Sequence, residues 1–267
     1  MGIKQYLLLA TLFVFVLSPQ SAFAQSSVVS PTDTEQKMQL YRDQISVYRD
    51  AERTFDVSKG QYIKLQTLAS LEEAVLGTRN VLLARSKVLI QYFELLHDEL
   101  SAQHGVNLQE KEEVLSRLKN QLTYLQQHQD QVLLANDRDA LAAVVLDFDE
   151  HQELLEDAVY RARTLTAIGK VQTVNDKARA LLEDIKKEHA KEPVNTSISA
   201  QRDRAYAETT KHIDQTEAEI LEIMDSGYNR VANSFTKSRF NQILDDLSDP
   251  YVTAQKSLGF LKELLSL

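Results

Sequence analysis

Apolar residues recur at alternating intervals of three and four along most of the chain after residue 32. The clearest case is a line of aromatic residues spaced strictly by seven: Tyr41, Tyr48, Phe55 and Tyr62. Because seven residues are nearly two helical turns, these four rings fall on one face of an α-helix. The Arg and Asp that follow Tyr41 and Tyr48 in "YRDQISVYRD" do not recur after Phe55 and Tyr62. The sequence therefore keeps an aromatic packing position there and not a repeated binding motif.

The composition agrees with long helices. Seven glycines and four prolines in 267 residues are about a third of ordinary usage, and the turns between strands need both residue types. Charged residues make up 26% of the chain, enough to cover the outer faces of helices. We therefore expect an all-α fold, an elongated bundle of about six long helices.

The spacing of apolar residues and breaks predicts where these helices run. The first two are expected over residues 32–66 and 70–103, and a third from residue 107 to a turn at 135–139. The fourth, over residues 137–190, would be roughly 80 Å long against roughly 50 Å for each of the first two. Such a helix needs further partners along its second half. We therefore predict a four-helix bundle (residues 32–165) followed by a three-helix bundle (residues 166–267) that shares the long fourth helix.

Local signals refine these boundaries. Thr32 with Glu35, and Ser70 with Glu73, have the spacing of capping boxes at helix starts. Gly105 is expected to take a left-handed conformation at the end of the second helix. That helix carries three adjacent apolar lines, one of them made of Leu76, Leu83 and Ile90, which predicts a central position with several neighbours. A loop is expected over residues 226–234 and a kink or restart at residues 248–250, where Pro250 lies.

The first 24 residues have the features of a secretory signal peptide. Lys4 precedes an apolar run of 13 residues from Tyr6 to Ser18, and Ala22 and Ala24 form a small-residue site for cleavage before Gln25. A membrane-spanning helix needs about 20 apolar residues, so the run is too short for an anchor. Residues 25–31 are expected to be a flexible leader. We predict a periplasmic, extracellular or cell-envelope protein with no stable membrane insertion after cleavage.

Charge and cysteine content exclude several classes of function. The formal net charge is −9, and loss of Lys4 with the signal peptide makes it −10. An acidic chain without a basic stripe argues against nucleic acid as a partner. The chain contains no cysteine, so thiol catalysis, thiolate metal sites and covalent c-type haem are excluded.

Two residue pairs have the spacing of metal ligands on one helix face. Glu94 and His97 form a Glu-x-x-His pair, but no second such pair exists to complete a dinuclear site. Asp147 and His151 are i,i+4 neighbours that could share a divalent cation, or they could be an ordinary polar pair on a solvated face. Both pairs are candidate metal ligands. No catalytic motif and no cofactor motif is recognised.

The aromatic line can be interpreted in two ways. Tyr41, Tyr48, Phe55 and Tyr62 could fill the seam against the second helix, with the Tyr hydroxyl groups reaching solvent. They could instead face a second molecule, either a partner or another copy. Periodicity does not choose between these surfaces.

Two stretches carry a resemblance to other chains. Residues 48–96, from "YRDAERTFDVSKGQYIKLQTLAS" through "YFELL", and "SLGFLKELL" near the end resemble uncharacterised exported all-helical, coiled-coil-like proteins of candidate-phylum bacteria. The resemblance implies export and an elongated helical bundle. It implies no activity and no functional residue.

These observations predict an exported, non-enzymatic helical protein whose role is protein–protein interaction or cell-envelope structure, with a protein partner or a second copy of the chain. The alternative is a periplasmic ligand- or metal-binding bundle that uses Glu94, His97, Asp147 and His151. A third reading is an enzyme whose site is set only by tertiary geometry.

Overall fold

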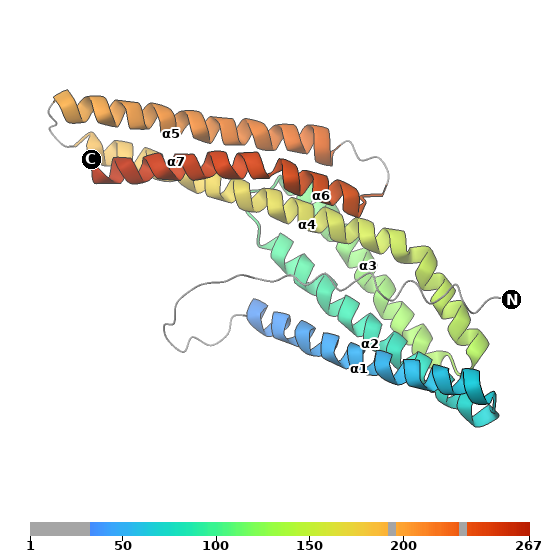
Figure 1. Cartoon of the computed structure of the whole chain (residues 1–267). Coiled ribbons are helices and arrows are strands. Elements are labelled where there is room, and N and C mark those ends of the chain that lie inside the picture. Colours follow the sequence, from blue (N-terminus) through green and yellow to red (C-terminus); the bar gives the residue numbers. More distant parts are fainter. Residues whose placement is uncertain (1–32, 192–195, 230–233) are drawn as a thin grey trace. The chain divides into compact units, whose positions relative to one another are not determined.

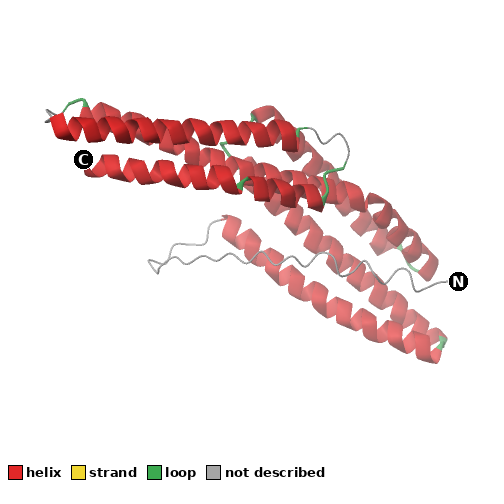
Figure 2. Ribbon diagram, turned by 45° about the horizontal axis from the view of Figure 1, so that its top comes forward, coloured by secondary structure: helices red, strands yellow, loops and turns green. Residues whose placement is uncertain are grey.

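The computed structural model describes residues 33–191, 196–229 and 234–267 of the chain. These residues form helices joined by short connections, and none of them lies in a β-strand (Figure 2). The predicted all-α class is confirmed. In chain order the helices are α1 (Asp33–Leu65), α2 (Leu68–Ser101), α3 (Leu108–Leu134), α4 (Arg138–His189), α5 (Thr196–Glu222), the π-helical η1 (Ile223–Tyr228), α6 (Lys237–Asp246) and α7 (Ser248–Ser266) (Figure 1). The predicted signal peptide, the leader and Thr32 lie outside the described residues.

Short polar side chains begin several of these helices. The Asn107 side chain accepts a hydrogen bond from the N–H of Gln109 at 2.9 Å, and Asp137 accepts one from the N–H of Ala140 at 2.8 Å. Both residues cap the N-termini of the helices that the sequence predicts from them.

The start of α2 differs from the prediction. A capping box joins the side chains and backbone N–H groups of Thr67 and Ser70, so the predicted box of Ser70 with Glu73 is wrong. The helix begins at Leu68, two residues earlier than expected, which makes Ser70 the third helical residue. Just before this cap, Gln66 has a φ of 50°, and this left-handed residue reverses the chain between α1 and α2.

α2 lies at the centre of the first part of the fold. It packs against α1, α3 and α4, as its three apolar lines predict. Phe93, Leu96 and Leu100 of α2 are at most 5% exposed in the core that α3 and α4 complete. α1 packs against α2 and against no other helix of the described chain. It is therefore the outermost member of the four-helix part.

The long helix α4 is shared by both parts of the fold, as predicted. Its first half packs on α2 and α3, and its second half packs on α5 and α7 (Figure 1). Leu182 of the second half lies in a separate core cluster with Ile213 of α5 and Leu261 of α7. The 52 residues of α4 correspond to a helix about 80 Å long.

Two connections refine the predicted boundaries. Residues 226–228, expected in a loop, belong to the π-helical turn η1, and residues 230–233 of that loop lie outside the described chain. The predicted restart near Pro250 is confirmed, because α6 ends at Asp246 and α7 begins at Ser248 with Pro250 in its first turn.

Gly105 does not take the left-handed conformation that the sequence predicts. It has an ordinary φ, and its lack of a side chain lets the α2–α3 connection approach the backbone of α4 at Gly169 and Thr173. The residue is required by packing and not by a helix cap.

Candidate functional site

The aromatic line of α1 faces α2. The ring of Tyr41 stacks on that of Tyr92, with centroids 5.5 Å apart and an interplanar angle of 27°. Further along the hairpin, the backbone of Phe55 and the Ser58 hydroxyl lie against Gly77. The four rings are half-buried, and burial raises the pKa of Tyr41 and Tyr48 above the usual value for a tyrosine. The ladder therefore fills the seam between α1 and α2.

A cluster of polar and aromatic side chains lies between α2, α3 and α4. Arg85 of α2 is at its centre. The Arg85 guanidinium carbon lies 3.8 Å from the centroid of the Phe148 ring. Burial lowers the pKa of Arg85, while the nearby Tyr48 and Asp149 act in the opposite direction. The apolar stem and the planar head of Arg85 thus pack as part of the core.

His128 continues the cluster on α3. Its side chain is fully buried, its Nδ1 lies 3.1 Å from the Ser86 hydroxyl, and its ring centroid lies 5.2 Å from that of Phe148. Burial, and then the charge of Arg85, lowers the pKa of His128 to about 4. Ser86 in turn donates to the carbonyl oxygen of Leu82 at 3.0 Å. Ser86 and His128 are both fully buried, so this Ser–His pair is inaccessible to a substrate.

The candidate metal ligands Asp147 and His151 share a different partner, Tyr124. The Tyr124 hydroxyl donates to Asp147 Oδ2 at 2.9 Å, and the His151 ring stacks on the Tyr124 ring with centroids 3.9 Å apart. His151 Nδ1 lies 4.0 Å from the Asp147 carboxylate. The two residues are brought together, but both are engaged by a tyrosine that is not a ligand for a hard divalent cation.

The other candidate pair lies on α2. Glu94 accepts a hydrogen bond from the Gln91 amide at 3.1 Å, and His97 Nδ1 lies 3.6 Å from the carboxylate of its neighbour Asp98. Asp98 is itself paired with Lys37 of α1. Within the described residues no three His, Asp or Glu side chains are grouped so that they could hold a metal ion.

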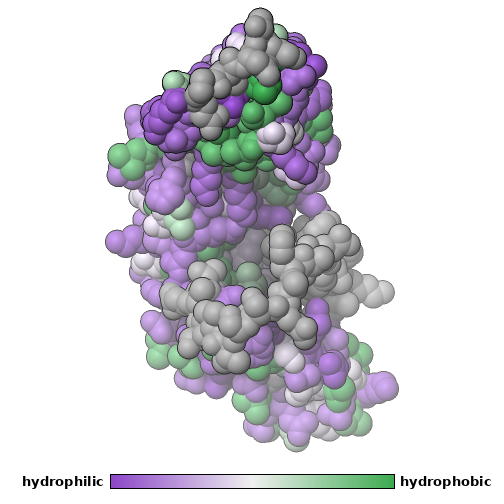
Figure 3. Space-filling model, turned by 90° about the vertical axis from the view of Figure 1, so that its left-hand side faces the viewer, coloured by the Kyte–Doolittle hydropathy of each residue, from purple (hydrophilic) through white to green (hydrophobic). Residues whose placement is uncertain are grey.

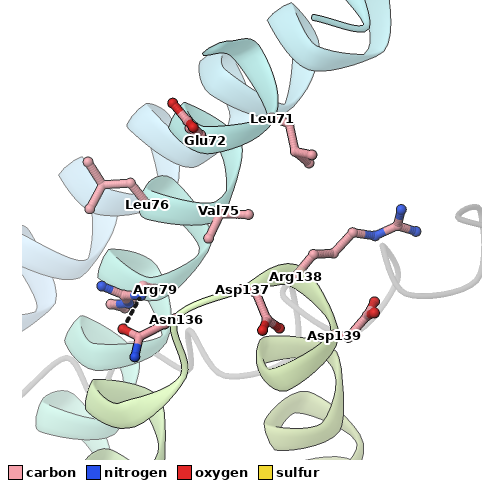
Figure 4. A pocket seen from close by; sticks show the side chains of 9 residues that line it. All are labelled: Leu71, Glu72, Val75, Leu76, Arg79, Asn136, Asp137, Arg138 and Asp139. Atoms are coloured by element: carbon pink, nitrogen blue, oxygen red, sulfur yellow. Dashed lines mark hydrogen bonds between the residues drawn. The ribbon is translucent and has the colours of Figure 1, made fainter. Parts of the chain in front are cut away.

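A hollow of about 530 Å³ lies where the first turns of α2 meet the α3–α4 connection. Figure 4 looks onto α2, with Leu76 at one edge, Leu71 at the other and Val75 between them. Charged side chains surround these apolar residues, and the full lining is Leu71, Glu72, Val75, Leu76, Arg79, Asn136, Asp137, Arg138 and Asp139. We call this region the end hollow.

The end hollow exists because α2 extends past the end of α3. The Arg79 guanidinium donates to the carbonyl oxygen of Ala135, the residue that caps α3, at 2.5 Å. This contact places the end of α3 level with Arg79. The eleven residues from Leu68 to Thr78 therefore extend beyond it, and we call this segment the overhang.

The overhang carries both covered and exposed apolar residues. Leu82 of α2 is 5% exposed in a cluster with Val132, Ala135 and Leu141 of α3, its cap and α4. One turn or more earlier, Leu76 is 54% exposed and Leu68 is 71% exposed. The end of α3 adds Leu134, which is 77% exposed. Leu71 and Val75, between Leu68 and Leu76, are half-buried, and Val75 packs against the Leu82 cluster, so the large exposed apolar residues of the overhang are Leu68 and Leu76.

Sequence reasoning missed this surface. It placed Leu76 in an apolar line with Leu83 and Ile90, which are packed in the core. A signal was present in the helix lengths, since α2 has 34 residues and α3 has 27. A helix pair of unequal length leaves part of the longer stripe without a partner.

Two other regions of the surface differ from the end hollow in character. A polar hollow of about 240 Å³ includes Arg117 and Arg161, but both arginines face the carboxylate of Asp157, at 3.7 and 2.9 Å. The side on which α5 begins and α7 ends is mainly hydrophilic, with an apolar area at the top of Figure 3. The end hollow differs from both regions, because Leu71, Val75 and Leu76 line it together with charged residues.

Comparison with known proteins adds no relative: no protein-family model, curated protein or solved structure matches the chain. None of the helices in the described residues combines the length and the apolar character that crossing a membrane would require.

Proposed function

We propose that this chain is an exported, non-enzymatic helical protein that acts in the cell envelope by binding another protein molecule through the overhang of α2. The observation that carries the proposal is the exposure of two leucines of the overhang, Leu68 at 71% and Leu76 at 54%, beyond the end of α3. Contiguous apolar surface rimmed by charged groups is typical of protein-binding sites. A helix face without a neighbour also suits the docking of a second helical surface.

The organisation of the polar groups supports a role without catalysis. Ser86 and His128 are sealed in the core, and Asp147 and His151 are occupied by Tyr124. The alternative of a ligand- or metal-binding bundle rests on Glu94, His97, Asp147 and His151. It is less well supported because Asp147 and His151 pack on Tyr124, while Glu94 and His97 lie beside Gln91 and Asp98. Export is supported by the apolar run from Tyr6 to Ser18 and the small residues at Ala22 and Ala24.

The proposal is tested by photocrosslinking in cells that export the protein. A photoreactive amino acid placed at Leu76 is expected to give a discrete crosslinked species in the envelope fraction. Leu146 of α4 is the matched control, because it is also 54% exposed but does not line the end hollow. A Leu68→Glu change in the Leu76-labelled chain is expected to abolish the crosslink, because Leu68 is the other exposed leucine of the overhang.

Two results would overturn the proposal. The first is equal crosslinking from positions 76 and 146, which would mean that the overhang has no special affinity. The second is an intact amino terminus on protein that remains in the cytoplasm, which would remove the export half of the proposal. Mass spectrometry of the fractionated protein reads out the second result, since cleavage is expected before Gln25.

A further inference from the structure

We propose that two copies of this chain exchange their first helix, so that α1 of each copy packs on α2 of the other. The partner surface in this exchanged dimer is the one that α1 already covers within a single copy. The exchanged dimer goes beyond the proposed function, because it concerns α1 and its connection to α2 and not the molecule that the overhang binds. Three features of the hairpin support it: the isolation of α1, the strain in the connection and the symmetry of the contacts.

α1 can leave its place without disturbing the rest of the fold. It packs on α2 and on no other helix of the described chain, so the helices from α3 to α7 keep their contacts without it. Figure 1 shows α1 alongside α2, with α3 and α4 beyond α2. Only the connection between α1 and α2 has to open for α1 to pack on another copy.

The connection between α1 and α2 is short and strained. It consists of Gln66 and Thr67, since α1 ends at Leu65 and α2 begins at Leu68. Gln66 has a φ of 50°, and among the described residues other than glycine it alone has a positive φ. This left-handed conformation brings the Cβ atom of a residue other than glycine too close to the following carbonyl oxygen. In the exchanged dimer the connection no longer reverses the chain, so Gln66 can take a negative φ, and strained short connections favour such exchange.

The contacts between α1 and α2 are compatible with a two-fold axis. Tyr41 stacks on Tyr92, and Ser58 lies against Gly77. The residue numbers of these two pairs add up to 133 and 135, so the helices are in antiparallel register about a centre near residue 67. When α1 of one copy takes the place of α1 of the other, each pair is kept and occurs twice, and the axis passes near Thr67.

The exchange also brings exposed apolar residues close to the axis. Leu65 and Leu68 flank the connection and are 62% and 71% exposed. Because both lie next to the centre of the register, the same residues of the second copy are close to them in the dimer. The charged residues nearest to this centre along the chain are Lys64 and Glu72, which have opposite signs, so like charges are not concentrated there. Burial of the leucines therefore favours the dimer.

The exchange is expected to be slow and to depend on concentration. α1 must leave α2 before it can pack on another copy, and the loss of translational freedom on association opposes the dimer. We therefore expect the monomer to predominate at micromolar concentration and the exchanged dimer to be detectable on the order of 1 mM. Unfolding in urea and refolding at a chosen concentration let the two forms equilibrate.

A pair of cysteines identifies the exchange directly, since the chain has no cysteine of its own. A Cβ atom added at Gly77 lies 3.6 Å from the Cβ atom of Ser58, a separation that a disulfide allows. The variant Ser58→Cys/Gly77→Cys of residues 25–267 is refolded at about 1 mM, oxidised and separated by size-exclusion chromatography. The disulfide is expected within one chain in the monomer fraction and between two chains in the dimer fraction.

A denaturing gel without reductant distinguishes the two linkages. An exchanged dimer runs as a covalent dimer, whereas the monomer fraction runs as a single chain. A dimer fraction whose disulfides lie within single chains would overturn the exchange, because α1 would then still be packed on its own α2. The absence of any dimer after refolding of the unaltered chain at up to about 1 mM would overturn it as well.

Changes at the connection test the role of its strain. Gln66→Gly removes the cost of the positive φ in the monomer and is expected to lower the association constant about tenfold or more, because each dimer contains two connections. Gln66→Val is expected to raise the association constant about tenfold, because a β-branched residue resists a positive φ. Gln61→Val, at an exposed position inside α1, is the control and is expected to have no effect. Equal association constants for the two Gln66 variants would contradict the strain argument.

The position of the axis is tested separately. Leu65→Glu brings like charges of the two copies close together and is expected to weaken the dimer about tenfold. Leu40→Glu is the matched control, because Leu40 is a 53% exposed residue of the same helix far from the connection. Circular dichroism checks that both variants retain their helix content. Equal weakening by the two changes would overturn an axis near Thr67.

The outcomes separate the exchanged dimer from the proposed function. A monomeric chain that crosslinks from position 76 to a different protein in cells overturns the exchange and leaves the proposed function standing. An exchanged dimer, together with equal crosslinking from positions 76 and 146, supports the exchange and overturns the overhang as the binding surface. A monomeric chain with equal crosslinking from both positions overturns both.

Discussion

Gly105 and Gly169 pack backbone against backbone: a Cβ atom added at Gly105 would lie 2.6 Å from the carbonyl oxygen of Gly169. The same atom would lie 2.7 Å from the backbone nitrogen of Thr173. These are backbone atoms of a helix, so they cannot turn aside as a flexible side chain can. The contact joins the α2–α3 connection to the middle of α4, near the point where α4 passes from the first part of the fold to the second.

The first prediction follows from this contact. Gly105→Ala is expected to reduce the free energy of unfolding by about 1–3 kcal/mol, because the backbone must shift to admit the methyl group. Gly60→Ala is the control, since a Cβ there meets nothing within 4 Å and the residue lies inside α1. That change is expected to raise stability by up to about 1 kcal/mol. Urea unfolding followed by circular dichroism measures both, and equal effects would refute the packing argument.

The second prediction concerns Asp157 of α4. Its carboxylate accepts hydrogen bonds from the backbone N–H of Phe235 at 2.6 Å and from Arg161 Nε at 2.9 Å, and the residue is 7% exposed. It thus anchors the segment before α6 to α4. Asp157→Ala is expected to reduce the free energy of unfolding by about 3 kcal/mol, because the buried Phe235 N–H and Arg161 lose their acceptor. Glu153→Ala, at an exposed position one turn earlier, is expected to change the midpoint of urea unfolding very little.

The third prediction is a dependence of stability on pH. The neutral form of His128 is favoured in the folded protein, where its pKa is about 4, against about 6.5 in the unfolded chain. The contribution of neutral His128 to the free energy of unfolding is therefore complete above about pH 6.5, and it is lost as the pH falls from about 6.5 toward 4. Linkage gives a loss of about 2 kcal/mol between pH 7.5 and pH 5 from this residue alone.

The variant His128→Gln isolates this contribution, because the other five histidines are retained. Urea unfolding at a series of pH values is expected to show a shallower decline for the variant than for the unaltered chain. Arg85 and Asp147, which act on His128 in opposite directions, are unchanged in the variant. Parallel pH curves for the two proteins would show that His128 is not responsible.

The fourth prediction concerns the exposed position of α1. Because α1 has α2 as its only described neighbour, its backbone amides are expected to exchange with solvent faster than those of α2. Tyr41→Ala removes the ring stacked on Tyr92 and is expected to lower the free energy of opening of α1 by about 1 kcal/mol. This corresponds to about fivefold faster amide exchange in α1. Arg42→Ala, at the exposed neighbouring position, is expected to leave the rate unchanged. Hydrogen exchange with mass spectrometry resolves the two helices, and slower exchange in α1 than in α2 would contradict the prediction.

Much of the fold was predictable because its determinants are local. Asn107 and Asp137 begin helices through their own side chains and the next few N–H groups, so a window of four residues suffices to recognise them. The aromatic spacing from Tyr41 to Tyr62 likewise reports one helical face without knowledge of any neighbour. The prediction was wrong where two local patterns overlapped. Ser70 has the right spacing to be the N-cap residue of a box with Glu73, and also to be the third helical residue of a box with Thr67.

The amino-acid sequence alone determined that the chain forms long helices, where most of them begin and end, and that α4 is too long for the first part of the fold. These properties depend on periodicity and on contacts between residues a few positions apart. Only the tertiary structure decided which stretch of an apolar line is covered. Leu76 and Leu83 stand in the same heptad line, yet Leu76 is exposed because α3 ends at Leu134, level with Arg79. Burial depends on where a different helix stops, and no pattern within α2 contains that information.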